Sequence, residues 1–245
     1  CLTPGELETI AKLADEYDVV VIEDLAYFGM DFRHDYSKPG VAPFQPTVAQ
    51  YTDRYVLLIS SSKVFSYAGE RIGMLVVSDA LWTKRAPDLK RYFTSDEVGR
   101  ALVFGSIYAL SSGTSHSAQY ALAAVLKAVN DGTIDLVAPV REYGAKAAIM
   151  KRLFTDNGFR IVYDTDLDEP IADGFYFTVA YPGLSGEQLL HDLLCYGISA
   201  IGLTTTGSEH PEGLRACTSL IPRSQFPELE ARLAAFHRDH RAGRS

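Results

Sequence analysis

The sequence predicts an α/β fold in which a mostly parallel sheet forms a large domain and a smaller α+β domain follows it. Three observations support this prediction. Unbroken apolar runs, typical of strands buried in a parallel sheet, occur in "DVVVIED", "RYVLLISSSK" and "GMLVVSD". The first run follows a segment with helical periodicity, as in α/β domains. After a long helical segment, the chain changes to shorter units that alternate between strand and helix patterns.

The first helix is predicted over residues 6–17. Thr3 can cap it and Glu6 sits where a capping box requires a glutamate, while Pro4 suits the first turn. Apolar residues recur at helical spacing, so the helix is expected to lie on another element. They are Leu7, Ile10, Leu13 and Ala14. The three apolar runs that follow are predicted to be strands covered on both faces.

The remainder of the chain is predicted to be helical at first and then mixed. Residues 80–135 are mainly helical, with 117–129 the clearest segment. A long helix then ends at Gly158, which suits a left-handed cap. We expect residues 1–138 to be the later part of a large domain and residues 139–245 to be a small C-terminal domain. The strand and helix patterns of this second part lie at 159–164, 174–181, 185–197, 198–203, 213–220 and 226–240.

Composition excludes several classes of protein. The chain of 245 residues has a net charge of −8 and a pI near 5.2, which disfavours binding to nucleic acid. Its densest basic stretch, "KRAPDLKRYF", is interpreted as a solvated helix face. No apolar run approaches the roughly 20 residues that a membrane-spanning helix needs. Three widely spaced cysteines give neither a disulfide framework nor a zinc pattern, so a soluble, cytoplasmic protein is expected.

Polar residues follow the predicted strands at the sheet edge where ligands of α/β proteins gather. Asp24 ends one strand and Tyr27 lies three residues on, while Ser60, Ser62 and Lys63 follow the next strand. Arg71 precedes the third strand, and would lie at the same edge if that strand runs antiparallel. A desolvated lysine can condense with a carbonyl, a carboxylate can hold a proton on a ring nitrogen, and arginine and hydroxyls suit a phosphate. Together these groups match the requirements of pyridoxal phosphate.

The segments "DLAY" and "SSSKVFSYAGERIG" resemble fold-type I pyridoxal-phosphate enzymes, and in particular the class I/II aminotransferases. The resemblance continues through the second part of the chain. It implies that Lys63 bonds covalently to the cofactor aldehyde, that Asp24 pairs with the pyridine nitrogen and that Tyr27 bonds the phenolic oxygen. Ser60, Ser62 and Arg71 would hold the phosphate. Arg215 in "EGLRAC" would grip the substrate α-carboxylate, although its lead-in "TTTGSEHPEG" departs from the family pattern.

The resemblance also implies transamination between an L-amino acid and a 2-oxo acid, and a homodimer. A lyase or decarboxylase on the same fold, and a non-catalytic partner, remain alternatives. Ser61 and Tyr67 replace the apolar residues usual in the family. The family's first portion has no counterpart here, so we expect part of a longer enzyme or a product of cleavage. No second arginine is evident for a side-chain carboxylate, which disfavours aspartate and glutamate as the principal substrate.

Three histidines outside these motifs receive structural interpretations. His116 could approach the active site from a helix entry, but a structural role is favoured. The motif "HRDH", with His237 and His240, has a spacing that could hold a metal ion in principle. A frayed, solvated helix end is the preferred interpretation, and no metal site is predicted.

Overall fold

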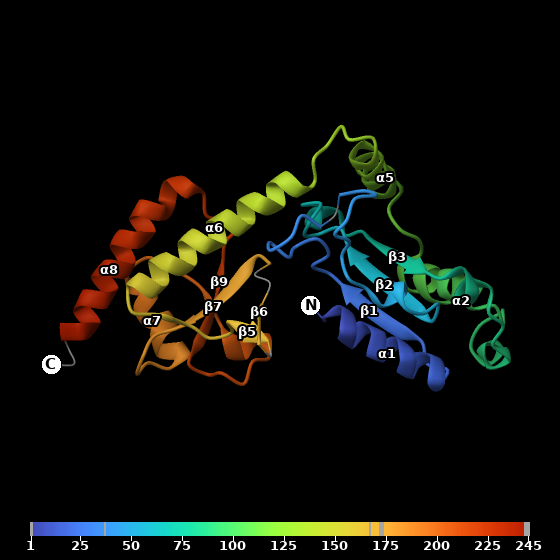
Figure 1. Cartoon of the computed structure of the whole chain (residues 1–245), viewed down its shortest axis with the longest axis horizontal. Helices are drawn as coiled ribbons and strands as arrows, with labels where there is room; N and C mark the ends of the chain where they lie inside the picture. Colours follow the sequence, from blue (N-terminus) through green and yellow to red (C-terminus); the bar gives the residue numbers. More distant parts are fainter. Residues whose placement is uncertain (1, 37, 167, 172–173, 243–245) are drawn as a thin grey trace. The chain divides into compact units, whose positions relative to one another are not determined.

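The computed structural model describes residues 2–36, 38–166, 168–171 and 174–242. The chain forms two compact units, each described here by itself (Figure 1). The first comprises Cys1–Gly29 and His34–Val137. The second comprises Ala138–Ser245 together with the short segment Met30–Arg33. The chain therefore enters the second unit briefly before its long C-terminal part begins.

A three-stranded sheet forms the centre of the first unit in its described residues, in the order β1-β2-β3. β1 (Val21–Leu25) and β2 (Tyr55–Ser60) are parallel, whereas β3 (Gly73–Val77) runs antiparallel to β2. The register pairs Ser60, at the end of β2, with Gly73, at the start of β3. The carboxyl ends of β1 and β2 and the entry to β3 therefore share one edge.

Helix α1 (Pro4–Glu16) packs on one face of this sheet. Thr3 and Glu6 form the predicted capping box, which satisfies donors at the helix start. The core between helix and sheet is apolar and also includes the start of the short 3₁₀ helix η1 (Val48–Gln50). Its buried members are Leu7, Ala11, Val48 and Leu57. The predicted apolar face is thus confirmed for Leu7, Ile10 and Ala14, whereas Leu13 is 50% exposed.

The opposite face of the sheet is largely open, which corrects the expectation of strands covered on both faces. The exposed fractions of Ile22, Leu58 and Leu75 are 67%, 38% and 37%. The register places these side chains on one face, because Asp24 pairs with Leu58, and Leu58 with Leu75. An apolar run shows that a strand could be buried, but it does not identify the element that would bury it.

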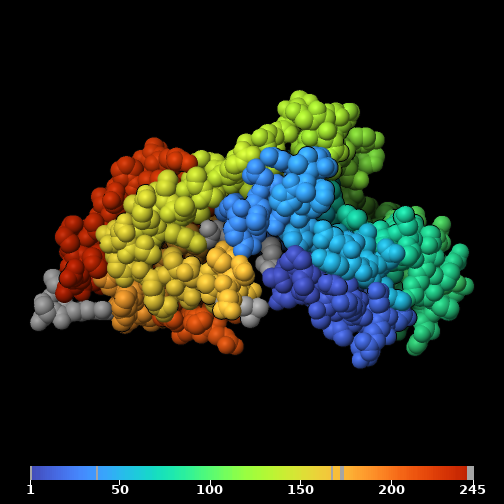
Figure 2. All heavy atoms as spheres, viewed as in Figure 1, coloured from blue at the N-terminus to red at the C-terminus, as the bar shows by residue number. Residues whose placement is uncertain are grey.

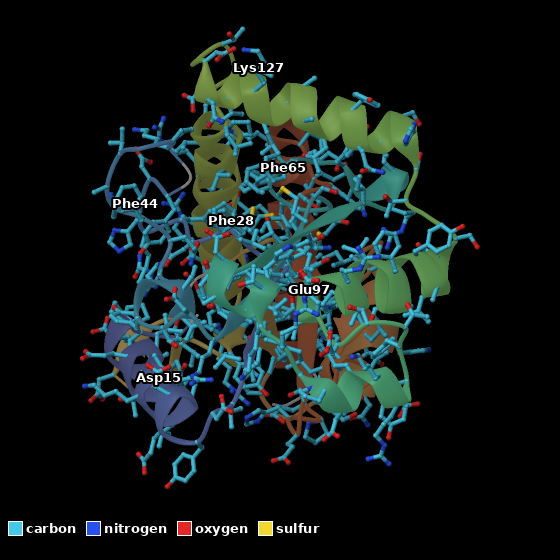
Figure 3. All side chains as sticks on the ribbon, turned by 90° about the vertical axis from the view of Figure 1, so that its right-hand side faces the viewer. Asp15, Phe28, Phe44, Phe65, Glu97 and Lys127 are labelled. Atoms are coloured by element: carbon cyan, nitrogen blue, oxygen red, sulfur yellow. The ribbon has the colours of Figure 1, made fainter. Side chains whose placement is uncertain are left out.

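Ion pairs lie at the end of the sheet where β1 and β2 begin. Arg54, just before β2, contacts Asp15 at 3.2 Å and also pairs with Asp18, which receives Lys84 at 3.0 Å. Figure 3 shows Asp15 far from Phe28 and Phe65, which belong to the loops after β1 and β2. These charges therefore lie away from the edge where the site residues gather.

Helical segments complete the first unit. One of them, η4 (Ala101–Tyr108), is a π-helix, a wider helix that propensity does not predict. A side chain at Gly99 would collide with Trp82, and one at Gly105 with Phe93, so glycine permits both close approaches. The other segments are η2 (Ala68–Glu70), α2 (Asp79–Thr83), η3 (Pro87–Arg91), α3 (Val98–Arg100), α4 (Ala109–Ser111) and α5 (His116–Asn130).

The second unit contains an antiparallel sheet in the order β4-β7-β9-β8. Helix α6 (Val137–Asp156) leads into it and is followed by Gly158, whose φ of +83° is the predicted left-handed cap. The other elements are β4 (Arg160–Ile161), β5 (Thr165–Asp166), β6 (Glu169–Pro170), β7 (Tyr176–Ala180), α7 (Gly186–Cys195), β8 (Ile201–Gly202), η5 (Leu203–Thr206), β9 (Gly213–Cys217), η6 (Arg223–Gln225) and α8 (Phe226–Ala242).

The core of the second unit joins three helices to one face of this sheet. Phe177 and Leu214 of the sheet are buried among side chains of α6, α7 and α8, including Phe154, Leu189 and Leu233. The atoms of α6 and α8 lie against each other in the space-filling view (Figure 2). Alternate residues of β7 and β9 face away from this core. Tyr176 and Arg215 are therefore on the opposite face.

Candidate active site

The loop after β2 presents Lys63. Its geometry is fixed by short-range bonds: the Ser62 N–H donates to Ser60 Oγ at 3.1 Å, and the Ser66 N–H donates to the Lys63 carbonyl at 2.9 Å. The Lys63 side chain is half-buried. Its Nζ lies 5.5 Å from the centre of the Tyr27 ring, on the ring face. The structure thus brings together the amine and the phenol that the sequence singled out.

The turn after β1 carries Asp24 and Tyr27. One Asp24 oxygen, Oδ1, accepts the Ala26 N–H at 3.0 Å, and the turn closes through the Phe28 N–H, which donates to the Leu25 carbonyl at 3.0 Å. The Asp24 side chain is exposed, and in the described residues its second oxygen accepts no hydrogen bond. The second oxygen of Asp24 can therefore accept a hydrogen bond from a ligand.

Arg71 reaches the same edge through the antiparallel arrangement of β3. It follows η2 in the left-handed conformation (φ 52°, ψ 46°), which is uncommon for a residue with a side chain. Its Nη1 donates to the Ala68 carbonyl at 2.8 Å. The other guanidinium N–H groups have no acceptor in the part of the chain that the structure describes, so they can bind an anion.

Ser61 is a buried residue beside the candidate site, and the sequence reasoning gave it no role. Its side chain is fully buried, and its hydroxyl donates to the carbonyl of Ile72, directly after Arg71. Its own carbonyl accepts the Tyr67 N–H at 3.1 Å. Ser61 therefore ties the Lys63 loop to the Arg71 segment. Its departure from the apolar family pattern was the available signal, because a buried hydroxyl requires a partner.

Glu23 precedes Asp24 but points to the other face of the sheet. Its carboxylate accepts the Val48 N–H at 2.9 Å, and burial raises the pKa of Glu23 above its ordinary value. An apolar cavity of about 420 Å³ adjoins it, lined also by Leu7, Leu25 and Asp24. Lys63 does not line this cavity, so we do not assign the cavity as the place where a cofactor or substrate would react.

The donor set at this edge fits pyridoxal phosphate chemically. Lys63 supplies an amine for an aldehyde, and Asp24 an open carboxylate oxygen for a protonated ring nitrogen. Arg71 and the Ser62 hydroxyl have donors that no described residue occupies, as a phosphate requires. The roles of these residues, and of Tyr27 and Ser60, remain predictions.

Arg215 belongs to the second unit, where it lies on β9 opposite Thr178 of β7. Its guanidinium carbon is 4.3 Å from the centre of the Tyr176 ring. Its Nε is buried and has no hydrogen-bond partner among the described residues. A buried donor without an acceptor is costly, which suits a residue that receives a carboxylate. Its role toward the substrate remains a prediction.

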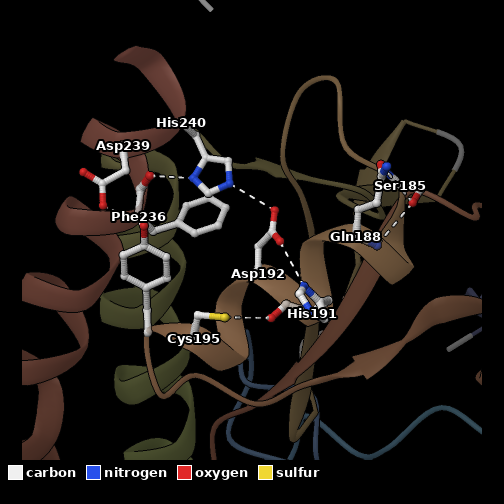
Figure 4. A network of polar contacts seen from close by, with 9 residues as sticks. Ser185, Gln188, His191, Asp192, Cys195, Phe236, Asp239 and His240 are labelled. Atoms are coloured by element: carbon white, nitrogen blue, oxygen red, sulfur yellow. Dashed lines mark hydrogen bonds and ion pairs between the residues drawn. The ribbon is translucent and has the colours of Figure 1, made fainter. Parts of the chain in front are cut away.

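The "HRDH" motif partly corrects the expectation of a frayed, solvated helix end, because Arg238 and Asp239 are exposed while the two histidines contact neighbouring elements. His240 stacks on Phe236, with ring centres 3.9 Å apart, and is 21% exposed (Figure 4). Its Nε2 contacts Asp192 of α7 at 3.1 Å, and its Nδ1 contacts the Phe236 carbonyl at 2.9 Å. His237 contacts the Tyr181 hydroxyl at 2.9 Å. These residues join α8 to its neighbours, and no metal-binding group occurs within the described residues.

His116 is exposed at the start of α5, with its ring edge-on to Tyr120. The favoured structural role therefore amounts to this surface contact. Cys195 and Cys217 are free thiols in the described part of the chain. A search of the described helices finds none with the length and apolar character needed to cross a membrane.

Sequence comparison identifies related proteins. The family model described as "Aminotransferase class I and II" matches residues 1–233. A curated sequence named "Probable aspartate aminotransferase", from Methanocaldococcus jannaschii, is 32% identical over 75 residues, which is 31% of this chain and 18% of that protein.

Structure comparison shows the fold. The aromatic aminotransferase of Pyrococcus horikoshii matches with a TM-score of 0.68 at 18% identity, covering 98% of this chain and 56% of that one. The α-aminoadipate aminotransferase of Thermus thermophilus, solved with N-(5'-phosphopyridoxyl)-L-leucine, matches with a TM-score of 0.65 at 20% identity, covering 96% and 54%. The predicted α/β, fold-type I architecture is confirmed. The chain spans about half the length of these structures.

Proposed function

The chain belongs to the class I and II aminotransferase family, and we propose that it acts in pyridoxal-phosphate-dependent transfer of an amino group between an L-amino acid and a 2-oxo acid. The observation that carries this proposal is the Lys63 amine on the face of the Tyr27 ring, in a loop tied by Ser61 to the Arg71 segment. We assign residues 1–138 to the later part of the large domain and residues 139–245 to the small domain.

Each residue at the sheet edge has a distinct task in this proposal. Lys63 holds the cofactor covalently when substrate is absent and moves a proton at the substrate Cα when its amine is free. Asp24 keeps the ring nitrogen protonated, and Tyr27 donates to the neighbouring ring oxygen. The cofactor supplies an electron sink for the bond that breaks at Cα. Ser60, Ser62 and Arg71 bind the phosphate and hold the ring in place.

Arg215 orients the amino acid in this proposal. Its planar guanidinium can hold the α-carboxylate through two parallel hydrogen bonds, and its buried Nε lacks an acceptor among the described residues. The Tyr176 ring supports the guanidinium from one side. An oriented carboxylate fixes the direction of the Cα–H bond, which selects the bond that breaks.

The partners follow from the family. We propose a homodimer that takes amino-acid and 2-oxo-acid substrates. We also propose a cytoplasmic location, which the free thiols of Cys195 and Cys217 support. An acidic chain without a basic cluster supports the absence of a nucleic-acid partner.

Covalent capture of the cofactor tests the proposal. The full-length protein is incubated with pyridoxal phosphate, reduced with borohydride and digested, and the pyridoxyl group is located by mass spectrometry. We expect the label on Lys63 and its loss in Lys63→Ala. Lys90→Ala is the matched control, because Lys90 is an exposed lysine that pairs with Asp96. Labelling spread over surface lysines, unchanged in Lys63→Ala, would refute the assignment.

A half-reaction identifies the chemistry. The loaded enzyme is mixed with single amino acids, and the release of pyridoxamine phosphate is measured against the release of ammonia or carbon dioxide. Transamination predicts an amine-form cofactor and a stoichiometric 2-oxo acid. Ammonia or carbon dioxide instead would assign a lyase or a decarboxylase.

A further inference from the structure

One short segment of chain connects the candidate site to the second unit. Asp24 and Tyr27 belong to the first unit, whereas Met30–Arg33 is part of the second. Only Phe28 and Gly29 separate Tyr27 from Met30. Because an extended chain spans at most roughly 3.6 Å per residue, Tyr27 and Met30 stay within about 11 Å of each other. The position of Tyr27 therefore depends on how both ends of this segment are held.

The first unit holds the segment at Gly29. The Gly29 N–H donates to Oε1 of Gln45 at 3.2 Å, and both residues are buried. The φ of Gly29 is +69°, in the left-handed region that favours glycine. The chain therefore turns at Gly29 immediately before it enters the second unit.

The second unit holds the segment through Arg33, which a buried carboxylate of the same segment keeps in place. Asp31 is 3% exposed and receives Arg33 through Nε at 2.9 Å and Nη2 at 2.7 Å, as well as the Arg33 N–H at 3.0 Å. Arg33 Nη1 donates to the Pro170 carbonyl at 2.6 Å. A bidentate pair between arginine and a buried carboxylate is among the strongest hydrogen-bonded contacts in proteins.

Packing fixes the same segment against α6. Met30 is 2% exposed. A Cβ atom at Gly144 of α6 would approach Cβ of Phe32 to 2.8 Å, closer than real contacts allow. The helix therefore carries glycine where Phe32 rests on it. Packing of Phe32 on α6 and the hydrogen bond from Arg33 to Pro170 attach these residues to the rest of the second unit, and the Asp31 carboxylate orients Arg33.

We propose that Met30–Arg33 is a clip through which the second unit positions Tyr27 beside the Lys63 amine, with Asp31 and Arg33 as positioning residues. Because Gly29 is tied to Gln45 of the first unit and Met30 is buried in the second, a loosened clip removes one of the two restraints on the turn that carries Tyr27. The role of Tyr27 toward a cofactor rests on the proposed function, but the mechanical coupling does not.

Hydrogen exchange tests the coupling without cofactor. In the full-length protein, Arg33→Leu is compared with Arg223→Leu, which removes another bidentate pair of the second unit, to Glu142 at 2.7 and 2.9 Å. We expect the backbone amides of residues 26–29 to exchange roughly tenfold faster in Arg33→Leu and at the native rate in Arg223→Leu. Native rates in both variants, or equal acceleration in both, would overturn the clip.

A spectroscopic measurement separates positioning from folding. In the cofactor-loaded protein, Arg33→Leu should shift the pH midpoint of the visible absorption of the bound cofactor, Arg33→Lys should partly restore it, and Arg223→Leu should leave it native. A native midpoint in Arg33→Leu would refute the positioning role. If the wild type binds no cofactor, the proposed function fails and hydrogen exchange still decides the clip. If Arg33→Leu does not fold, Asp31→Asn takes its place in both measurements.

Discussion

At the residue scale, the buried hydroxyl of Ser61 connects the two loops of the candidate site. In Ser61→Ala the partly buried Ile72 carbonyl loses the donor that the fully buried Ser61 supplies, which costs about 1–3 kcal/mol in the free energy of unfolding. Phosphate affinity should fall as well, because Arg71 precedes Ile72. Urea unfolding and equilibrium binding of pyridoxal phosphate measure the two effects.

Ser111→Ala is the matched control for this change. The Ser111 hydroxyl also donates to a carbonyl, that of Ile107 at 2.6 Å, but the bond is exposed and water can replace it. We expect a change within about 0.5 kcal/mol and unaltered phosphate affinity. Equal destabilisation by the two substitutions would contradict the role of Ser61.

The sequence predicted those site residues that come shortly after a strand. Lys63 and Tyr27 come together because they follow adjacent parallel strands, a relation that the apolar runs already indicate. The Ser61 bond to Ile72 could not be predicted, because it depends on the path of the chain between Tyr67 and β3. The bond between Gly29 and Gln45 likewise depends on a loop whose sequence has no period.

At the element scale, α7 and α8 are joined by a polar cluster around Asp192. Hydrogen bonds from His240 and then from His191 hold the pKa of Asp192 below its ordinary value of 3.8. An acid with a lowered pKa stabilises the fold above its ordinary value and loses that contribution as the pH falls through the lowered value. This contact should therefore weaken below about pH 4.

The substitution Asp192→Asn tests this contribution. We expect lower stability than wild type at neutral pH and convergence of the two proteins as the pH falls toward 3, measured by urea unfolding across pH 3–7. Asp131→Asn, which removes an exposed pair with Lys127 within a single helix, should change stability little at any pH. A constant difference between wild type and Asp192→Asn across the range would contradict the linkage.

Elements with strong periodicity were predicted well, and those defined by tertiary contacts were not. The helix ending before Gly158 and the strand over Tyr55–Ser60 agree with the pattern of the sequence. Helix was predicted over Ala101–Tyr108, but its π type was missed, because apolar periodicity does not distinguish the two kinds of helix. The contacts of His237 and His240 near the end of α8 were missed because the polar residues there indicated solvent.

At the scale of the whole molecule, the two units have separate cores, and we expect separate unfolding transitions. Leu233 is fully buried in the second core, so Leu233→Ala should destabilise that unit by about 2–5 kcal/mol. Trp82, the single tryptophan of the chain, reports on the first unit. Its fluorescence transition in urea should stay unchanged while the helical circular-dichroism signal shifts.

Leu7→Ala is the reciprocal experiment, because Leu7 is buried in the core beneath α1. It should shift the Trp82 fluorescence transition to lower urea concentration. The part of the circular-dichroism transition that reports on the second unit should stay in place. A single transition that moves as one in both variants would show that the chain unfolds as one cooperative body.

The open sheet of the first unit affects how the chain behaves in solution. In the described residues, β1 and β3 each pair with β2 alone, so both outer strands keep a row of backbone amides and carbonyls available for pairing. Because Ile22 is exposed beside one such row, we expect the polypeptide to self-associate through edge-to-edge strand pairing at high concentration. Low concentration and mild chaotropes are then the practical conditions for keeping it monodisperse.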